Sequence, residues 1–301
     1  MLEDLWQQFR KANLITYEIT PIAPEMGAVI RDFRLSDDIA PAQLASIRSD
    51  LLKYKVLFFR DQQHLNAEMQ QRLSRLFGEP FGQPEQSDLH TLIRSQDSFS
   101  PEGEKHSRND KRFRNDVWHV DRVYLAAYPK IAILLALKVP NFGDTLWANT
   151  EIAYRNLPRP LRELAEKLRV RHSDALYQSA PDASHINSPA KHEVVHPMVI
   201  VHPETAERSL LVGNLAQRIE GLSSRESSAL LNIFQSHIEQ PEHVIRWSWR
   251  EGDVAIWDAR STQHYAVDDY GTSTRCMRRI LLQGDAPTGI DGNRSVQLPL
   301  E

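Results

Sequence analysis

Short apolar runs of strand length, separated by turns and charged segments, make up most of the chain. They are rich in β-branched and aromatic residues, the composition expected of strands in a half-buried sheet. The runs are ITYEIT (15–20), GAVI (27–30), KVLFF (55–59), IAILLALKV (131–139), VVHPMVIVH (194–202), SLLVG (209–213), HVIRWSWR (243–250), DVAIWD (253–258) and RRILLQG (278–284). We therefore expect many short strands.

Fewer segments have the apolar spacing of helices. This spacing predicts a helix beginning at the acidic turn 36–38, and further helices around 69–77, near 151–168 and near 223–238. Many strands with few helices favour a mainly β fold, and specifically a double-sheet jelly roll with helices packed outside it. Because no repeat or change of composition marks a boundary, we expect residues 1–301 to form a single domain.

Composition narrows the classes of function. With 41% hydrophobic residues, 25% charged residues and a formal net charge of -4, the chain has no basic excess for binding nucleic acid or membranes. The longest apolar run, Ile131 to Leu137, is far shorter than the roughly 20 residues of a membrane span, and the first residues lack a basic region, so we expect a cytoplasmic protein. The only cysteine is Cys276, so any metal must be bound by His, Asp or Glu.

One long segment differs from its surroundings. Residues 79–114 are poor in aliphatic side chains, and the stretch EGEKHSRNDKRFRND (102–116) is dense in charge. Long polar segments of this kind often close over an active site, so we interpret residues 79–114 as a lid, with partial disorder as the alternative.

A candidate metal site follows this segment. The alternation in NDVWHVDRVY (115–124) predicts a strand, and its period of two places His119 and Asp121 on one face. With a third ligand from a distant strand, the pair would form the 2-His-1-carboxylate triad of non-haem Fe(II) oxygenases. The pair alone is also compatible with a structural His–Asp hydrogen bond on a half-buried face.

Downstream residues could complete such a site. The strand-forming run GDVAIWDARSTQHYAV leads to His264. In RCMRRILLQGD, which begins eleven residues later, Arg275 and Arg279 share one face of an extended chain, about 13 Å apart at ~3.3 Å per residue. A solvated basic edge strand is the simpler alternative for these arginines.

Taken in order, the motifs have a close family likeness. The segments ITPIAPEMGAVI, KVLFFRDQ, WHVD, GDTLWANTEIAYRNLP, HPETAERSLLVGN, GDVAIWDARSTQHYAVDDY and RRILLQGD span nearly the whole chain. The chain resembles the Fe(II)/2-oxoglutarate-dependent dioxygenases of the taurine dioxygenase (TauD/TfdA) family. The resemblance implies a double-stranded β-helix core, homo-oligomers, and hydroxylation or desaturation of an unactivated C–H bond by Fe(II), 2-oxoglutarate and O2, with release of succinate and CO2.

The resemblance also implies roles for individual residues. It assigns His119, Asp121 and His264 as iron ligands, Thr145 and Arg275 as holders of the far carboxylate of 2-oxoglutarate, and Asn115 and Arg279 as substrate contacts. Charge accounting is consistent with these roles: iron with Asp121 carries one positive charge, 2-oxoglutarate two negative charges, and Arg275 completes neutrality. Arg279 then favours a small anionic substrate such as a sulfonate, sulfate or carboxylate.

The chain departs from the taurine enzymes at the substrate pocket. Gln83-Pro84-Glu85-Gln86 stands where they carry His-Pro-x-Tyr, and Leu215 where they carry an aromatic residue. We expect Gln83 and Leu215 to contact the substrate, and taurine itself is a doubtful substrate.

A rival motif points to another class of enzyme. HEVVHPMVIVH (192–202) matches the zinc-peptidase pattern, with Glu193 activating water and three histidines binding zinc: His192, His196 and His202. That pattern needs a helix, whereas the β-branched run and Pro197 favour a strand. A third possibility is a non-enzymatic jelly-roll binding module, which would not need the 2-oxoglutarate arginine.

Overall fold

A seven-stranded sheet forms the largest layer of the structure. The computed structural model describes residues 17–82, 91–94, 117–175, 192–271 and 273–299. In spatial order, the strands of the large sheet are β1 (Glu18–Ala23), β2 (Met26–Arg31), β3 (Val56–Phe59), β13 (Val254–Asp258), β5 (Ile131–Lys138), β15 (Cys276–Leu282) and β4 (Thr91–Arg94). Neighbouring strands run antiparallel except β2 and β3, which are parallel.

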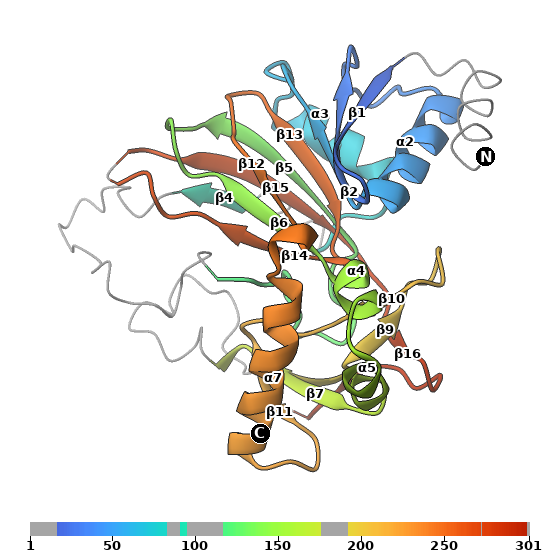
Figure 1. The fold of residues 1–301 in the computed structure, drawn as a ribbon. Helices are drawn as coiled ribbons and strands as arrows, with labels where there is room; N and C mark the ends of the chain where they lie inside the picture. The colour runs from blue at the N-terminus through green and yellow to red at the C-terminus, as the bar shows by residue number, and fades with distance from the viewer. Residues whose placement is uncertain (1–16, 83–90, 95–116, 176–191, 272, 300–301) are drawn as a thin grey trace.

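Three smaller sheets and a set of helices make up the rest of the described part of the chain (Figure 1). The first small sheet is β12 (Val244–Trp247), β6 (Thr145–Asn149) and β14 (Thr262–Ala266). The other two are β11 (Ala216–Ile219), β7 (Arg169–Ser173), β8 (Glu193–Pro197) and β17 (Val296–Gln297), and β10 (Arg208–Leu210), β9 (Val199–Val201) and β16 (Thr288–Gly289). The helices are α2 (Pro41–Tyr54), α3 (Ala67–Arg75), α4 (Thr150–Arg155), α5 (Arg159–Ala165), α7 (Ser224–Ile238) and the short 3-10 helix η3 (Pro241–His243).

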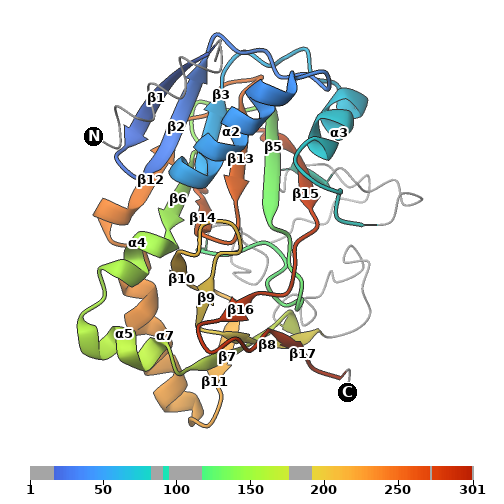
Figure 2. The ribbon, with the colours of Figure 1, turned by 90° about the vertical axis from the view of Figure 1, so that its right-hand side faces the viewer.

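Helices α2 and α3 cover the outer face of the large sheet (Figure 2). Ile47 and Leu73 from the two helices are buried with Leu57 of β3 and Ile133 of β5. Helix α2 begins later than the acidic turn predicts, because Pro41 occupies the first turn, where its missing N–H costs nothing. This cluster, the outer core, therefore stabilises the large sheet on the face that α2 and α3 cover.

A second apolar core, the inner core, fills the space between the large sheet and the β12–β6–β14 sheet. Phe58 of β3 stacks on Trp247 of β12 with ring centroids 4.0 Å apart, and its ring meets Trp147 of β6 edge-on. Trp257 and Val120 belong to the same buried cluster. Since Val120 separates His119 from Asp121 in the sequence, this core brings the candidate ligands against the inner face of the sheets.

Helices α4, α5 and α7 pack around a third core with β7, β9 and β10. Helix α7 begins at a capping box: the Ser223 hydroxyl accepts the backbone N–H of Glu226, and the Glu226 carboxylate accepts the N–H of Ser223. In the expected helix 151–168 the structure has two helices, because the chain breaks at Pro158 between α4 and α5. None of the helices in the described ranges is long and apolar enough to cross a membrane.

The mainly β character is confirmed, but one expected strand is wrong. Residues 117–124 make only an isolated bridge, between His119 and His264, and the chain then turns at Asp121 to Tyr124 with Arg122 in the left-handed region at φ 53°. Alternation in the sequence cannot reveal such a turn. Within the segment 79–114 expected as a lid, residues 91–94 form β4 on the edge of the large sheet beside β15, and residues 83–90 and 95–114 lie outside the described residues, so the lid stays a prediction.

Candidate active site

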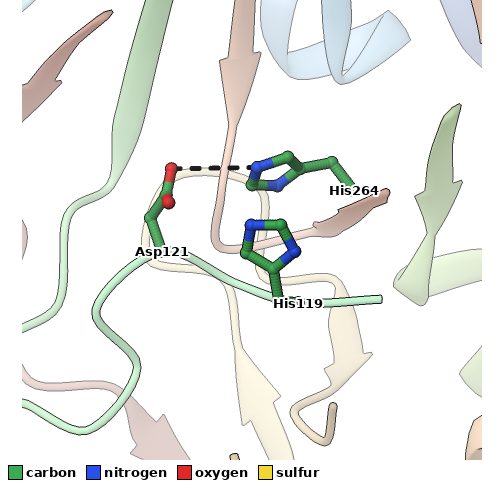
Figure 3. A group of neighbouring side chains, drawn as sticks. All are labelled: His119, Asp121 and His264. Carbon is green, nitrogen blue, oxygen red and sulfur yellow. Dashed lines mark ion pairs between the residues drawn. The ribbon is translucent and has the colours of Figure 1, made fainter. Parts of the chain in front are cut away.

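His119 and His264 lie side by side because their backbones are hydrogen-bonded to each other. Each residue donates its N–H to the carbonyl of the other at 3.0 Å. His264 is on β14, which β6 fixes at the edge of the inner core. The two imidazole rings, seen in Figure 3, have centroids 4.0 Å apart.

Asp121 completes a group of three potential metal ligands. Its Oδ2 lies 3.9 Å from Nε2 of His264, and one ligand atom from each of the three side chains lies within 4.8 Å of the others. All three residues are buried, with exposed fractions of 6% for His119, 7% for Asp121 and 8% for His264. In the part of the chain that the structure describes, this is the only group of three or more such side chains.

The protonation states suit metal binding. Burial lowers the pKa of both histidines, so both are neutral at pH 7 and keep a free nitrogen lone pair. His119 Nδ1 lies 2.7 Å from the Val117 carbonyl and must donate to it, which leaves Nε2 as the ligand atom. Burial, the largest single influence, opposes ionisation of Asp121, but the neighbouring side chains, Arg279 first among them, together outweigh it and the pKa of Asp121 is lowered.

The residues present fit a divalent ion. Asp121 Oδ1 accepts a hydrogen bond from Nη1 of Arg279 at 2.5 Å, whereas Oδ2 is buried without a hydrogen-bond partner. A buried carboxylate oxygen without a partner is costly unless a ligand occupies the site. Two neutral imidazoles and one carboxylate oxygen are the donor set of non-haem Fe(II) oxygenases.

Thr145 and Arg275, which are 130 residues apart in the sequence, meet on β6, where Thr145 pairs with Ala266, two residues after His264 on β14. Nη2 of Arg275 lies 3.4 Å from Thr145 Oγ1, and its Nε donates to the Gly143 carbonyl at 3.1 Å. Gly143 has φ +83°, and a side chain there would lie 2.7 Å from the ring of Tyr270. Arg275 is 6% exposed, and this burial lowers the pKa of its guanidinium.

The arginines around β15 point to opposite sides of the sheet, as the alternation predicts. Met277 lies in the inner core and Ile280 in the outer core. Arg279 accordingly reaches Asp121 on the inner side, whereas Arg278 reaches α3 on the outer side and donates to Gln70 Oε1 at 2.6 Å. The basic edge strand considered as an alternative is thereby excluded.

The remaining predicted substrate contacts are only partly described. Leu215 is 1% exposed and belongs to the inner core with Val120 and Val123. Asn115 and Gln83 lie outside the described residues. The expected contact between Leu215 and the substrate stays a prediction.

The histidines of the zinc-peptidase motif do not form a metal site, so that interpretation is wrong. Residues 193–197 are strand β8 rather than a helix, because the β-branched residues fit a sheet. Each histidine has a different partner: His192 contacts Asp174, His202 contacts Asp258, and His196 contacts the Val123 carbonyl.

Some contacts of the site could not be foreseen. Trp249 donates its indole N–H to Thr145 Oγ1 at 2.9 Å and so fixes the hydroxyl that faces Arg275. The alternation in the run 243–250 indicates a strand but not this contact, since β12 ends at Trp247.

Comparisons with known proteins agree with this geometry. The family model "Taurine catabolism dioxygenase TauD, TfdA family" matches residues 18–281. The chain is 40% identical over 296 residues to an alpha-ketoglutarate-dependent sulfate ester dioxygenase of Pseudomonas putida, covering 94% of this chain and 95% of the relative. It is also 40% identical over 288 residues to an alkylsulfatase of Acinetobacter baylyi, covering 91% and 87%. A solved taurine dioxygenase from Burkholderia xenovorans superposes with a TM-score of 0.78 at 32% identity, covering 94% and 97%.

The chain therefore belongs to the TauD/TfdA family of dioxygenases. It is a 2-oxoglutarate-dependent dioxygenase that uses Fe(II), 2-oxoglutarate and O2.

Proposed function

We propose that His119, Asp121 and His264 hold the iron, and that the enzyme hydroxylates a small alkyl sulfate ester at the carbon next to the ester oxygen. The single observation that carries the site assignment is the convergence of the three buried ligands with one unpartnered carboxylate oxygen. Iron bound there with 2-oxoglutarate and O2 supplies the oxidising power for an unactivated C–H bond, with succinate and CO2 as coproducts.

Arg275 and Thr145 are proposed to bind the far carboxylate of 2-oxoglutarate. Arg275 keeps Nε on the Gly143 carbonyl, which holds the guanidinium plane and directs its remaining N–H groups toward Thr145. A guanidinium in this position can meet a carboxylate with two parallel hydrogen bonds. Exclusion of water from this buried pair strengthens the interaction.

Arg279 is proposed to bind the anionic group of the substrate. It donates to Asp121 through Nη1, but its Nε is buried without a hydrogen-bond partner. Iron, Asp121, 2-oxoglutarate and the two arginines Arg275 and Arg279 together leave one positive charge, which a monoanionic substrate neutralises. A sulfate monoester carries the single negative charge needed and offers several acceptor oxygens.

The chemistry of a sulfate ester fits an oxygenase that releases sulfate. Hydroxylation of the carbon that bears the ester oxygen replaces one C–H bond by C–OH. The product is a hemiacetal ester: its hydroxyl loses a proton, the C=O bond of an aldehyde forms, and the C–O bond to sulfate breaks. Two relatives at 40% identity, named sulfate ester dioxygenase and alkylsulfatase, support this substrate class.

Further features belong to the same proposal. The two facing β layers are consistent with a jelly roll built from a single domain of 301 residues, with residues 79–114 proposed as a lid over the site. Homo-oligomeric assembly and a cytoplasmic location also stay predictions. A lid would be cut more slowly by protease when 2-oxoglutarate and substrate are bound, and unchanged cleavage would contradict it.

The substrate class can be tested with four compounds of similar size or charge: hexyl sulfate, hexanesulfonate, hexanoate and taurine. Succinate, aldehyde and inorganic sulfate are measured after incubation with Fe(II), 2-oxoglutarate and O2. We expect hexyl sulfate to give the highest kcat/KM, with equal amounts of aldehyde and sulfate. Preferential turnover of hexanoate or the sulfonate would reject the sulfate ester, and sulfate released together with hexanol would indicate hydrolysis.

A further inference from the structure

The turn that carries Asp121 has an unfavourable backbone conformation. Arg122, the next residue, lies in the left-handed region at φ 53°, and the turn closes with a hydrogen bond of 3.0 Å from the Leu125 N–H to the Arg122 carbonyl. Residues with side chains rarely adopt this conformation, and it persists where surrounding contacts hold it. The direction of the Asp121 side chain therefore depends on what holds the turn.

The contacts that hold the turn come from a separate sheet, through β8 and β17. His196 of β8 lies with its Nε2 2.7 Å from the Val123 carbonyl, two residues after Asp121. Gln297 of β17 accepts the Ala126 N–H at 2.8 Å, and its side-chain amide donates to the Tyr124 carbonyl at 3.3 Å. Both residues therefore hold the backbone just after Asp121 through hydrogen bonds.

His196 is itself fixed in one orientation. It is fully buried, its Nδ1 lies 2.6 Å from the Ser295 hydroxyl, and its ring packs edge-on against the rings of Tyr128 and His172. Burial lowers the pKa of His196 to about 4, so the ring is neutral at pH 7. Since a carbonyl can only accept, Nε2 carries the proton and Nδ1 accepts from Ser295.

We propose that His196, assisted by Gln297, is a positioning residue for the metal centre: it holds the Val123 carbonyl and thereby keeps Asp121 directed toward His119 and His264. The inference rests on the proposed role of the three residues as metal ligands. It gives the second histidine of the zinc-peptidase-like motif a function in iron binding without direct contact to the metal.

Two substitutions separate the contacts of His196. His196→Asn keeps an acceptor near the position of Nδ1 and loses the donor to Val123, whereas His196→Gln extends an amide N–H to about the position of Nε2. The metal-free proteins are titrated with Co(II), and binding is followed by its visible absorption. We expect His196→Asn to weaken Co(II) binding on the order of 10-fold to 100-fold, the usual effect of losing an outer-shell contact, and His196→Gln to restore most of the affinity.

His202→Asn is the matched control. His202 is another buried histidine of the same motif, its Nδ1 accepts the N–H groups of Glu204 and Thr205, and its Nε2 contacts Asp258 instead of the ligand turn. The same substitution there should lower the melting temperature but leave Co(II) affinity unchanged. A loss of affinity as large as that of His196→Asn would overturn the inference.

Gln297→Met provides a second test that does not alter the buried core. The variant of this exposed residue loses both contacts to the turn and one to the Glu193 carbonyl at nearly constant volume, and we expect Co(II) binding to weaken about 3-fold to 10-fold. If His196→Asn does not fold, this variant decides: unchanged affinity overturns the inference. Failure of the wild-type protein to bind Co(II), or binding that survives in Asp121→Ala, would instead reject the proposed function.

Discussion

Replacing Arg275 by methionine tests how 2-oxoglutarate is bound. The side chain is 6% exposed, and its guanidinium links the Gly143 carbonyl to Thr145. Methionine keeps much of the apolar volume but removes the positive charge and every N–H donor. The far carboxylate of 2-oxoglutarate would then be buried opposite a neutral side chain.

The structure sets the size of the expected effect. Truncating one partner of a buried, hydrogen-bonded charge pair costs about 2–5 kcal/mol. In the proposed assignment Arg275 keeps its Nε on Gly143 and would meet the cosubstrate through other N–H groups, so we expect the lower half of that range. At about 1.4 kcal/mol per factor of ten, the dissociation constant of 2-oxoglutarate should rise roughly 30-fold to 300-fold.

Arg278→Met is a matched control for this substitution. Arg278 is also nearly buried, with 9% of its surface exposed, but its guanidinium is directed away from the site, to Gln70 and the Leu65 carbonyl. It should lose stability by about 1–3 kcal/mol, because it leaves buried acceptors unpaired, without changing 2-oxoglutarate affinity. Calorimetric titration of the Mn(II)-loaded proteins measures both constants. Equal weakening in the two variants, or none in Arg275→Met, would refute the assignment.

Three further predictions concern the substrate, pH and a helix end. Arg279→Met should raise the KM for hexyl sulfate at least tenfold, while 2-oxoglutarate binds to the Mn(II) form within about threefold of wild type; the loss of about 2 kcal/mol expected for a buried ionic contact applies to the substrate alone. For His196, the folded-state pKa of about 4 lies below the ordinary value near 6.5, so as the pH falls the unfolded chain takes up the proton first and the folded protein loses stability between these values. The difference in free energy of unfolding between wild type and His196→Gln, measured by urea unfolding of the metal-free proteins, should therefore shrink by about 2 kcal/mol from pH 7 to pH 5. A constant difference would contradict the neutral buried ring. Ser223→Ala should lower the free energy of unfolding by about 1 kcal/mol through loss of the α7 capping box, and an unchanged urea midpoint would contradict that contribution.

Local patterns in the sequence predict much of the fold and of the site. Most apolar runs become strands, and alternation along β15 separates Arg279, on the inner side, from Arg278, on the outer side. Thr145 and Arg275 do lie together in the structure, although only the family resemblance connects them in the sequence.

The parts that fail depend on contacts between distant residues. Within the strand expected at 115–124, the described residues 121–124 form a turn instead, and the Val123 carbonyl there meets His196, 73 residues away, a contact that no local pattern contains. The ion pair between Asp121 and Arg279 joins residues 158 positions apart, so no local pattern contains it either. The spacing of His196 alone matches a zinc-peptidase motif, whereas the β-branched run around it correctly favours a strand.

The most direct test of the account is an anaerobic titration of wild type and Asp121→Ala with Fe(II) and 2-oxoglutarate, followed by visible absorption. An iron-chelated keto acid gives a visible charge-transfer band. We expect one band in the wild-type protein that saturates near one equivalent of Fe(II) and is absent in Asp121→Ala. A band that persists without Asp121, or a wild-type protein that shows none, would contradict the metal centre proposed at His119, Asp121 and His264.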